Sequence, residues 1–99
     1  MEYYVYFLRS LKDNGYYIGC TYYKPEDRLK NYHNRGIVFS TKFRMPWELV
    51  YFEIYNNKNT AFKREHYLKR PRGYQDKLNI INLIINTSKN NLPISLKKG

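Results

Sequence analysis

The chain has little of what stabilises a small secreted protein or anchors a protein in a membrane. Its single cysteine, Cys20, excludes an internal disulfide and favours a reducing, cytoplasmic setting. Its longest apolar run, residues 80 to 85, is interrupted by Asn82 and is far shorter than the roughly 20 residues of a membrane span. The first residues lack the basic and apolar segments of a signal peptide, so we expect neither export nor membrane insertion.

Acidic residues are also scarce, and this scarcity gives the chain its charge. Eight aspartates and glutamates are set against eighteen lysines and arginines, so the formal net charge of the 99 residues is +10. Such a charge attracts polyanions, of which nucleic acid and an anionic membrane surface are the main candidates. A membrane-surface helix would concentrate its basic residues on one long amphipathic segment. Here they are spread along the chain, which favours nucleic acid as the partner.

Turn residues and tyrosine-rich runs predict a β-hairpin near the start of the chain. Two runs, residues 3–8 and 16–19, flank Asn14-Gly15, a pair that accepts the backbone angles of a tight hairpin turn. A third strand is expected at residues 47–54, and helices are expected at residues 25–33, 61–70 and 74–86.

These elements predict a small α+β domain. Its three-stranded antiparallel sheet would combine the hairpin with the later strand, and about three helices would flank it. We expect residues 1–86 to form the domain and residues 87–99 to be a flexible C-terminal tail. Asn59 or Thr60 is expected to cap the helix that begins near residue 61.

Glu65 breaks the pattern of its predicted helix. It lies on the same face as Ala61, Phe62 and Leu68, a stripe that should be buried. A buried carboxylate must be paired, protonated or bound to a metal ion. One interpretation is a salt bridge to Arg28 or a nearby lysine. The other is a ligand for Mg²⁺, which retains water and takes few protein ligands.

Arg28 lies on the first predicted helix, where Tyr32 four residues later shares its face. An arginine on a helix surface is usually only solvated. If it lies on the same side of the sheet as inward tyrosines and a glutamate, it would instead neutralise charge that develops on a phosphate.

These residues give the chain a resemblance to the GIY-YIG nucleases, in particular to small stand-alone bacterial members that are similar to the N-terminal domain of the excinuclease. Tyr4–Tyr6 stands at the GIY position with its glycine and isoleucine replaced, and Tyr17–Gly19 is an intact YIG. Arg28 resembles the arginine of the following helix. The resemblance covers about residues 2 to 85, and it includes the segments 40–42, 46–51 and 61–65.

The resemblance implies metal-dependent hydrolysis of phosphodiester bonds in DNA. Tyr6 and Tyr17 would match the motif tyrosines that orient or deprotonate the attacking water, and Arg28 the arginine that stabilises the transition state. Glu65 would be the ligand of one divalent ion, Mg²⁺ or Mn²⁺, with no small-molecule cofactor. A phenol with a pKa of ~10 is a weak base at neutral pH, so we expect Arg28, the metal ion and the net charge to lower it.

The family often places a histidine or tyrosine four residues after this arginine. Tyr32 has that spacing, and an α-helix would put it on the face of Arg28. His33 follows one residue later and would take the position if the helix register were altered. Both residues are candidates for the site.

Further basic residues are expected to contact the nucleic-acid backbone without reading its sequence. One alternative function is a module that binds nucleic acid without cutting it, since the chain has no separate sequence-reading domain. Another is a basic structural protein, for instance one bound to ribosomal RNA. The oligomeric state is left open by the sequence. The expected backbone contacts are Lys42, Arg44, Lys63, Arg64, Lys69, Arg70 and Arg72.

Overall fold

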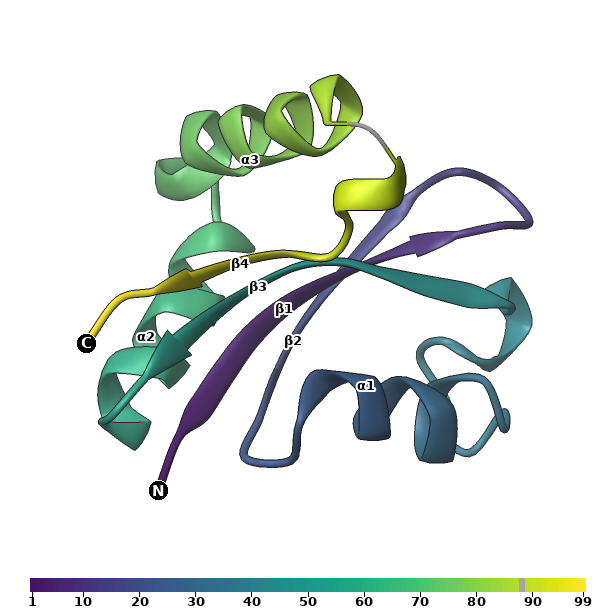
Figure 1. The fold of residues 1–99 in the computed structure, drawn as a ribbon, viewed down its shortest axis with the longest axis horizontal. Coiled ribbons are helices and arrows are strands. Elements are labelled where there is room, and N and C mark those ends of the chain that lie inside the picture. The colour runs from purple at the N-terminus through teal and green to yellow at the C-terminus, as the bar shows by residue number, and fades with distance from the viewer. Residues whose placement is uncertain (88) are drawn as a thin grey trace.

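A mixed β-sheet lies at the centre of the fold (Figure 1). The computed structural model describes residues 1–87 and 89–99, and these residues build one four-stranded sheet in the order β2-β1-β3-β4. Strands β1, β2 and β3 pair in antiparallel fashion, whereas β4 runs parallel to β3. The strands are β1 (Tyr3–Ser10), β2 (Tyr16–Thr21), β3 (Trp47–Tyr55) and β4 (Ile94–Lys97).

The helices cover both faces of this sheet. Helix α1 (Pro25–Arg28) continues directly into a π-helix (Leu29–His33), and the two lie on one face. Helices α2 (Lys58–Leu68) and α3 (Tyr74–Asn86) lie on the other. Pro25 suits the first turn of α1 because its missing N–H would have no partner there.

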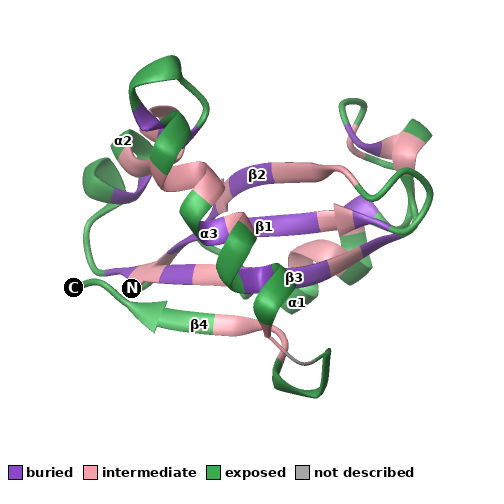
Figure 2. Cartoon of the chain, turned by 90° about the horizontal axis from the view of Figure 1, so that it is seen from above, coloured by how far each residue is buried: buried purple, intermediate pink, exposed green. Residues whose placement is uncertain are grey.

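Strand alternation gives β1 two buried faces, as the long purple stretch of β1 in Figure 2 shows. Val5 and Phe7 pack with residues of α2 and α3 in the larger core. Tyr6 and Leu8 point the opposite way and pack with Trp47 in a second, smaller core. A side chain of β1 can therefore reach the α1 side of the sheet only at alternate positions, and Tyr6 is one of them.

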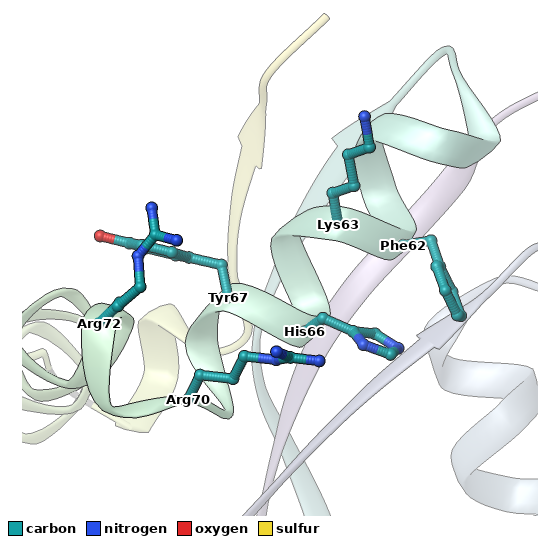
Figure 3. A pocket seen from close by; sticks show the side chains of 6 residues that line it. All are labelled: Phe62, Lys63, His66, Tyr67, Arg70 and Arg72. Atoms are coloured by element: carbon teal, nitrogen blue, oxygen red, sulfur yellow. The ribbon is translucent and has the colours of Figure 1, made fainter.

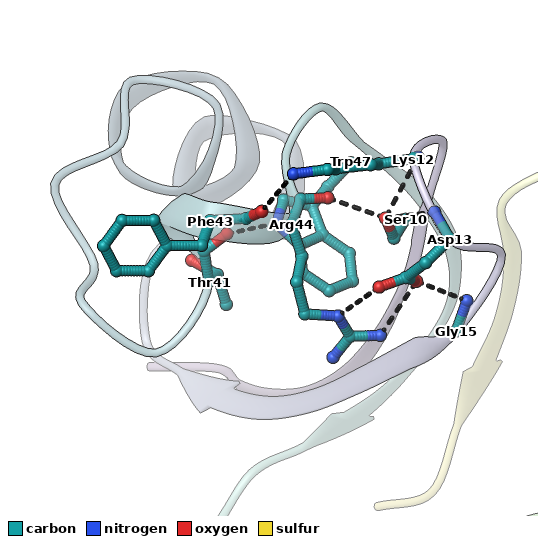
Figure 4. Close-up of polar contacts among 8 residues, drawn as sticks. All are labelled: Ser10, Lys12, Asp13, Gly15, Thr41, Phe43, Arg44 and Trp47. Atoms are coloured by element: carbon teal, nitrogen blue, oxygen red, sulfur yellow. Dashed lines mark hydrogen bonds and ion pairs between the residues drawn. The ribbon is translucent and has the colours of Figure 1, made fainter.

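The hairpin turn is fastened to the loop that precedes β3 (Figure 4). Asn14 adopts the positive φ of 62° that the turn requires. The buried Ser10 hydroxyl donates to the Arg44 carbonyl oxygen at 2.6 Å and accepts from the backbone N–H of Lys12 and Asp13. The Arg44 guanidinium binds both carboxylate oxygens of Asp13 and lies 4.9 Å from the centre of the Trp47 ring. These contacts fix the end of the loop that leads into β3.

A buried ion pair joins α2 to β3. The side chain of Glu53 is fully buried and accepts hydrogen bonds from the hydroxyls of Tyr51 and Tyr55, at 2.5 and 2.7 Å. Arg64 donates two more, each of 3.0 Å. Burial raises the pKa of Glu53, but the hydrogen bonds from Arg64, Tyr51 and Tyr55 outweigh it and hold the pKa below its ordinary value. Tyr51, Glu53 and Tyr55 alternate along one strand face, a pattern that could have indicated this network in the sequence.

The structure corrects several sequence-based expectations. The sheet is mixed and includes β4, so the expected three-stranded antiparallel sheet was wrong. Part of the expected tail is therefore a strand, while the domain boundary at residue 86 remains a prediction. Helix α2 begins at Lys58 rather than near residue 61, because the side chain of Asn57 caps it by accepting from the N–H of Thr60. Within the described part of the chain, no helix has the length and apolarity needed to cross a membrane.

Candidate active site

Tyr6 crosses strand β2 at a position where only glycine leaves room for it. In the β1–β2 ladder Tyr6 stands opposite Gly19. A Cβ at position 19 would lie 2.5 Å from both Cζ and the hydroxyl oxygen of Tyr6, far inside contact distance. The end of the Tyr6 ring therefore occupies the space that a side chain of β2 would take. The YIG glycine thus explains how the phenol reaches the edge of the sheet.

Tyr6 is the first member of a buried chain of hydrogen bonds. Its hydroxyl lies 2.7 Å from Nε2 of His33, and Nδ1 of His33 lies 2.9 Å from Oγ1 of Thr41. Thr41 Oγ1 also donates to the carbonyl oxygen of Val38 at 3.3 Å. A hydroxyl carries one proton and a carbonyl can only accept, so we assign the Thr41 proton to Val38. His33 then donates from Nδ1, and its Nε2 accepts the proton of the Tyr6 hydroxyl.

The π-helix explains why His33, rather than Tyr32, contacts Tyr6. Its wider turn is closed by the N–H of Asn34, which donates to the carbonyl oxygen of Leu29 five residues earlier. His33, five residues after Arg28, is fully buried against Tyr6. Tyr32 lies outside, stacked on Tyr23 with ring centres 5.7 Å apart. Tyr32 thus keeps the expected contact with Arg28, while the altered register brings His33 against Tyr6.

Arg28 presents a buried donor to the same place. Its Nε is buried and has no hydrogen-bond partner among residues 1–87 and 89–99. The guanidinium lies 4.6 Å from the centre of the Tyr32 ring, a cation–π contact that holds it from the outer side. A buried N–H without a partner is costly unless a ligand satisfies it. A phosphate oxygen is a suitable acceptor for this group.

Burial controls the protonation of the Tyr6–His33 pair. It raises the pKa of Tyr6 above the ordinary value, and hydrogen bonding and charge from Arg28 only partly oppose the rise. Arg28 therefore acts in the expected direction on the pKa of Tyr6, but burial outweighs it. Burial, with a smaller effect from Arg28, lowers the pKa of His33 to about 4. At neutral pH the pair consists of a neutral phenol and a neutral imidazole.

Tyr17 is the more exposed of the two motif tyrosines. Its ring centre lies 6.4 Å from that of Tyr6 and 5.3 Å from that of His33. Nζ of Lys69 lies 5.5 Å from the centre of the Tyr17 ring. Tyr6 is 1% exposed, whereas Tyr17 is partly exposed. Of the two motif tyrosines, Tyr17 is therefore the one that solvent can reach.

Glu65 reaches the same edge of the sheet from α2. Its charge contributes to the raised pKa of Tyr6, as does the neighbouring Tyr17. The Glu65 side chain is 12% exposed and forms a salt bridge of 3.0 Å with Lys69 and a contact of 3.6 Å with His66. The salt bridge to a nearby lysine, one of the two interpretations made from the sequence, is therefore present in the structure.

Glu65 is the carboxylate of this region that could hold a divalent metal ion together with other ligands. In the part of the chain that the structure describes, no three His, Cys, Asp or Glu side chains gather in a way that could hold a metal ion. A protein-only site for zinc or calcium would need such a group. Mg²⁺ can instead be held by one carboxylate together with water and substrate phosphate oxygens. Glu65 lines an open hollow, so these other ligands have access to it.

The expected backbone-contacting residues fall into three groups. Arg64 forms an ion pair with the buried Glu53, so we do not include it among the residues proposed to contact nucleic acid. Arg44 forms an ion pair with Asp13, and its main role is to hold the loop before β3. Lys42 lies over the rings of Phe39 and Phe43, at 5.1 and 4.9 Å. The remaining cations gather on and after α2, where they surround Glu65 or line a hollow beside it: Lys63, Lys69, Arg70 and Arg72.

Thr41 is a residue of this site that the sequence analysis did not single out. It lies in an irregular loop, where no periodic pattern shows which side chains point inward. The indole N–H of Trp47 donates to the Thr41 carbonyl oxygen at 3.0 Å and holds this stretch of backbone in place. The contact with His33 therefore depends on a residue of β3 as well as on the loop itself.

Comparisons with known proteins identify relatives over most of the chain. The family model of the GIY-YIG catalytic domain matches residues 2–79. The UPF0213 protein CPE1444 of Clostridium perfringens is 42% identical over 67 residues, which cover 68% of this chain and 70% of that protein. The UPF0213 protein SSP2268 of Staphylococcus saprophyticus is 35% identical over 68 residues, 69% of this chain and 80% of that protein. No solved structure matches the chain significantly. The chain belongs to the GIY-YIG catalytic domain family, which is a family of nucleases.

Proposed function

We propose that the protein is an endonuclease that hydrolyses phosphodiester bonds of DNA with one Mg²⁺ or Mn²⁺ ion. The observation that supports this proposal is the buried hydroxyl of Tyr6, which lies 2.7 Å from Nε2 of His33 and is influenced by the charges of Arg28 and Glu65. Four side chains from separate elements act on this phenol through contact or charge, namely Tyr17, Arg28, His33 and Glu65. Together they supply a proton acceptor, a cation for phosphate and a carboxylate for a metal ion.

The proton path would run inward along the buried chain. The partly exposed Tyr17 orients the attacking water, and the water proton passes to the Tyr6 oxygen as the Tyr6 proton moves to His33 Nε2. The resulting hydroxide forms the new P–O bond, and the bond to the leaving oxygen breaks. This leaving oxygen takes a proton from solvent. The raised pKa of Tyr6 disfavours a free phenolate, and His33 Nε2, 2.7 Å from the hydroxyl, is the neighbouring proton acceptor.

Two charged residues would act on the phosphate itself. The buried Nε–H of Arg28 donates to a non-bridging oxygen, where negative charge builds up in the transition state. Glu65 would hold the divalent ion, which supplies Lewis-acid stabilisation of the phosphate and of the leaving oxygen. The carboxylate is already paired with Lys69, so the lysine can turn to a substrate phosphate when the carboxylate is engaged elsewhere.

We expect Thr41→Val to lower kcat by roughly tenfold to a hundredfold with little change in KM. Valine keeps the shape but removes the acceptor of the His33 Nδ1–H, so the tautomer that accepts the Tyr6 proton loses its support. Thr41→Ser restores the hydroxyl and is expected to restore most of the rate. Steady-state cleavage of a labelled DNA oligonucleotide measures both constants. Equal rates for the valine and serine variants would exclude this role.

The function itself is tested with supercoiled plasmid DNA. We expect the purified protein to nick it in Mg²⁺ or Mn²⁺ and to stop when EDTA removes the metal ion. Gel electrophoresis separates supercoiled from nicked plasmid, and a binding titration at several salt concentrations runs beside it. Undiminished nicking in EDTA would contradict the metal-dependent mechanism. Salt-dependent binding without nicking in either metal would identify a non-cutting nucleic-acid-binding module instead.

A further inference from the structure

Phe62 is a large apolar side chain that the fold leaves uncovered beside Glu65. It lies on α2, one turn before Glu65, and is 53% exposed. Its ring leans on that of His66, with ring centres 4.2 Å apart, so its position is held although no core residue covers it. An exposed aromatic ring that is fixed in place next to a site is a ready surface for an aromatic ligand.

One side of Phe62 borders a small hollow that also contains Glu65. The hollow has a volume of about 210 Å³, below the roughly 300–1,000 Å³ of pockets that hold drug-sized ligands. Its walls include the rings of Tyr3 and Tyr22, and Lys58 supplies an ammonium group at its rim. Three aromatic side chains, with an ammonium group and hydroxyls as hydrogen-bond donors, suit a flat heterocycle that carries acceptor atoms.

The other side of Phe62 borders a larger and strongly basic hollow. Its volume is about 580 Å³, and Figure 3 shows its side chains projecting from α2 and from the turn that follows. None of the described residues that line it is acidic. Such a surface suits a phosphodiester backbone, which carries one negative charge per nucleotide. The lining residues are Phe62, Lys63, His66, Tyr67, Arg70 and Arg72.

We propose that the small hollow is a base-binding subsite for the nucleotide next to the phosphate at Glu65. The base stacks on Phe62 and Tyr22, and the backbone continues past Phe62 into the basic hollow. A base inside a duplex is covered on both faces by its neighbours, so the base that enters is unpaired. The subsite rests on the proposed function, because that function places the phosphate at Glu65. It gives the exposed rings of Tyr22 and Phe62 a role in binding.

The ligand used to test the subsite is a DNA trinucleotide with 2-aminopurine at its centre. The fluorescence of this base falls when it stacks on an aromatic ring. We expect the wild-type protein, without metal ion, to quench it, and Phe62→Ala to bind it about tenfold more weakly with most of the quenching lost. The matched control is Phe39→Ala, which removes another exposed ring, 75% exposed, outside both hollows. No quenching by the wild type, or equal quenching by Phe62→Ala, would overturn the subsite.

A cleavage experiment separates this proposal from the nuclease activity. On a longer labelled oligonucleotide with one abasic position, we expect the phosphate beside that position to be cut about tenfold less than other phosphates of the same strand. Phe62→Ala should cut all of them alike. If the wild type cuts all phosphates equally, the subsite is rejected, but the proposed nuclease activity is not. Quenching that depends on Phe62, without any cleavage, would support the subsite and reject the nuclease.

Discussion

Replacing Glu65 with glutamine is expected to lower the rate of metal-dependent cleavage by about a hundredfold to a thousandfold. The amide keeps the size of the side chain but lacks the charge that would hold a divalent ion. The salt bridge that it loses, with Lys69 four residues later, stabilises a helix by only about 0.3–0.5 kcal/mol. A large loss of activity would therefore not arise from unfolding. Plasmid nicking over a range of Mg²⁺ concentrations measures the effect.

A second carboxylate provides the control for this experiment. Glu48 is paired with Arg9, and its side chain is 20% exposed, close to the 12% of Glu65. The change Glu48→Gln makes the same chemical alteration away from the candidate site, and we expect it to leave cleavage near the wild-type rate. Nicking by Glu65→Gln at the wild-type rate would reject the one-metal mechanism. Equal losses in both variants would mean that the amide change acts through stability.

Arg64→Met is expected to lower the free energy of unfolding by about 3 kcal/mol near neutral pH. Removing one partner of a buried ion pair typically costs about 3–5 kcal/mol, because the other charge is left buried without compensation. Here the remaining charge is Glu53, which is fully buried. The Arg64 side chain is 23% exposed, which places the effect at the lower end of that range. Small domains are stable by about 5–15 kcal/mol, so the loss is a large part of the total.

Urea unfolding at several pH values distinguishes this cause from lost packing. In the wild type the pKa of Glu53 lies below its ordinary value. The contribution of Glu53 to stability is therefore complete above pH ~4.3, the pKa of a glutamate in the unfolded chain, and it disappears as the pH falls through the lower pKa of the folded protein. Without Arg64, burial dominates and the Glu53 carboxyl takes up a proton more easily. The deficit of Arg64→Met should therefore shrink as the pH is lowered toward 4. Arg70→Met, an exposed arginine of the basic hollow, should be within about 0.5 kcal/mol of the wild type.

The sequence predicted the elements whose signals are local. The turn residues at Asn14-Gly15 and the apolar stripe at residues 74–86 each lie within one short segment, and both elements occur where they were expected. Strand β4 gave no such signal. It is four residues long, lies at an edge and is largely exposed, and it pairs with β3 across about 40 residues of intervening chain. Parallel pairing of this kind depends on tertiary packing rather than on the pattern of the segment.

The arrangement of the candidate site was only partly accessible from the sequence. The family resemblance named Tyr6, Tyr17, Arg28 and Glu65, and the structure brings these side chains into one region. The choice between Tyr32 and His33 depended on one residue of helix register, which side-chain periodicity does not report. The π-helix is visible only in backbone hydrogen bonds, such as that from Asn34 to Leu29. The chemical roles of the four residues that the resemblance named stay predictions.

Arg64 and Glu65 are neighbours in the chain but face different parts of the protein. Consecutive residues of an α-helix project about 100° apart, so the contact of Arg64 with the sheet determines how α2 is rotated about its axis. That rotation in turn determines where the carboxylate of Glu65 is aimed. If Glu65 holds a metal ion as proposed, a substitution at position 53 or 64 would therefore alter the affinity for that ion without changing its ligand. In relatives, these two positions should vary together or not at all.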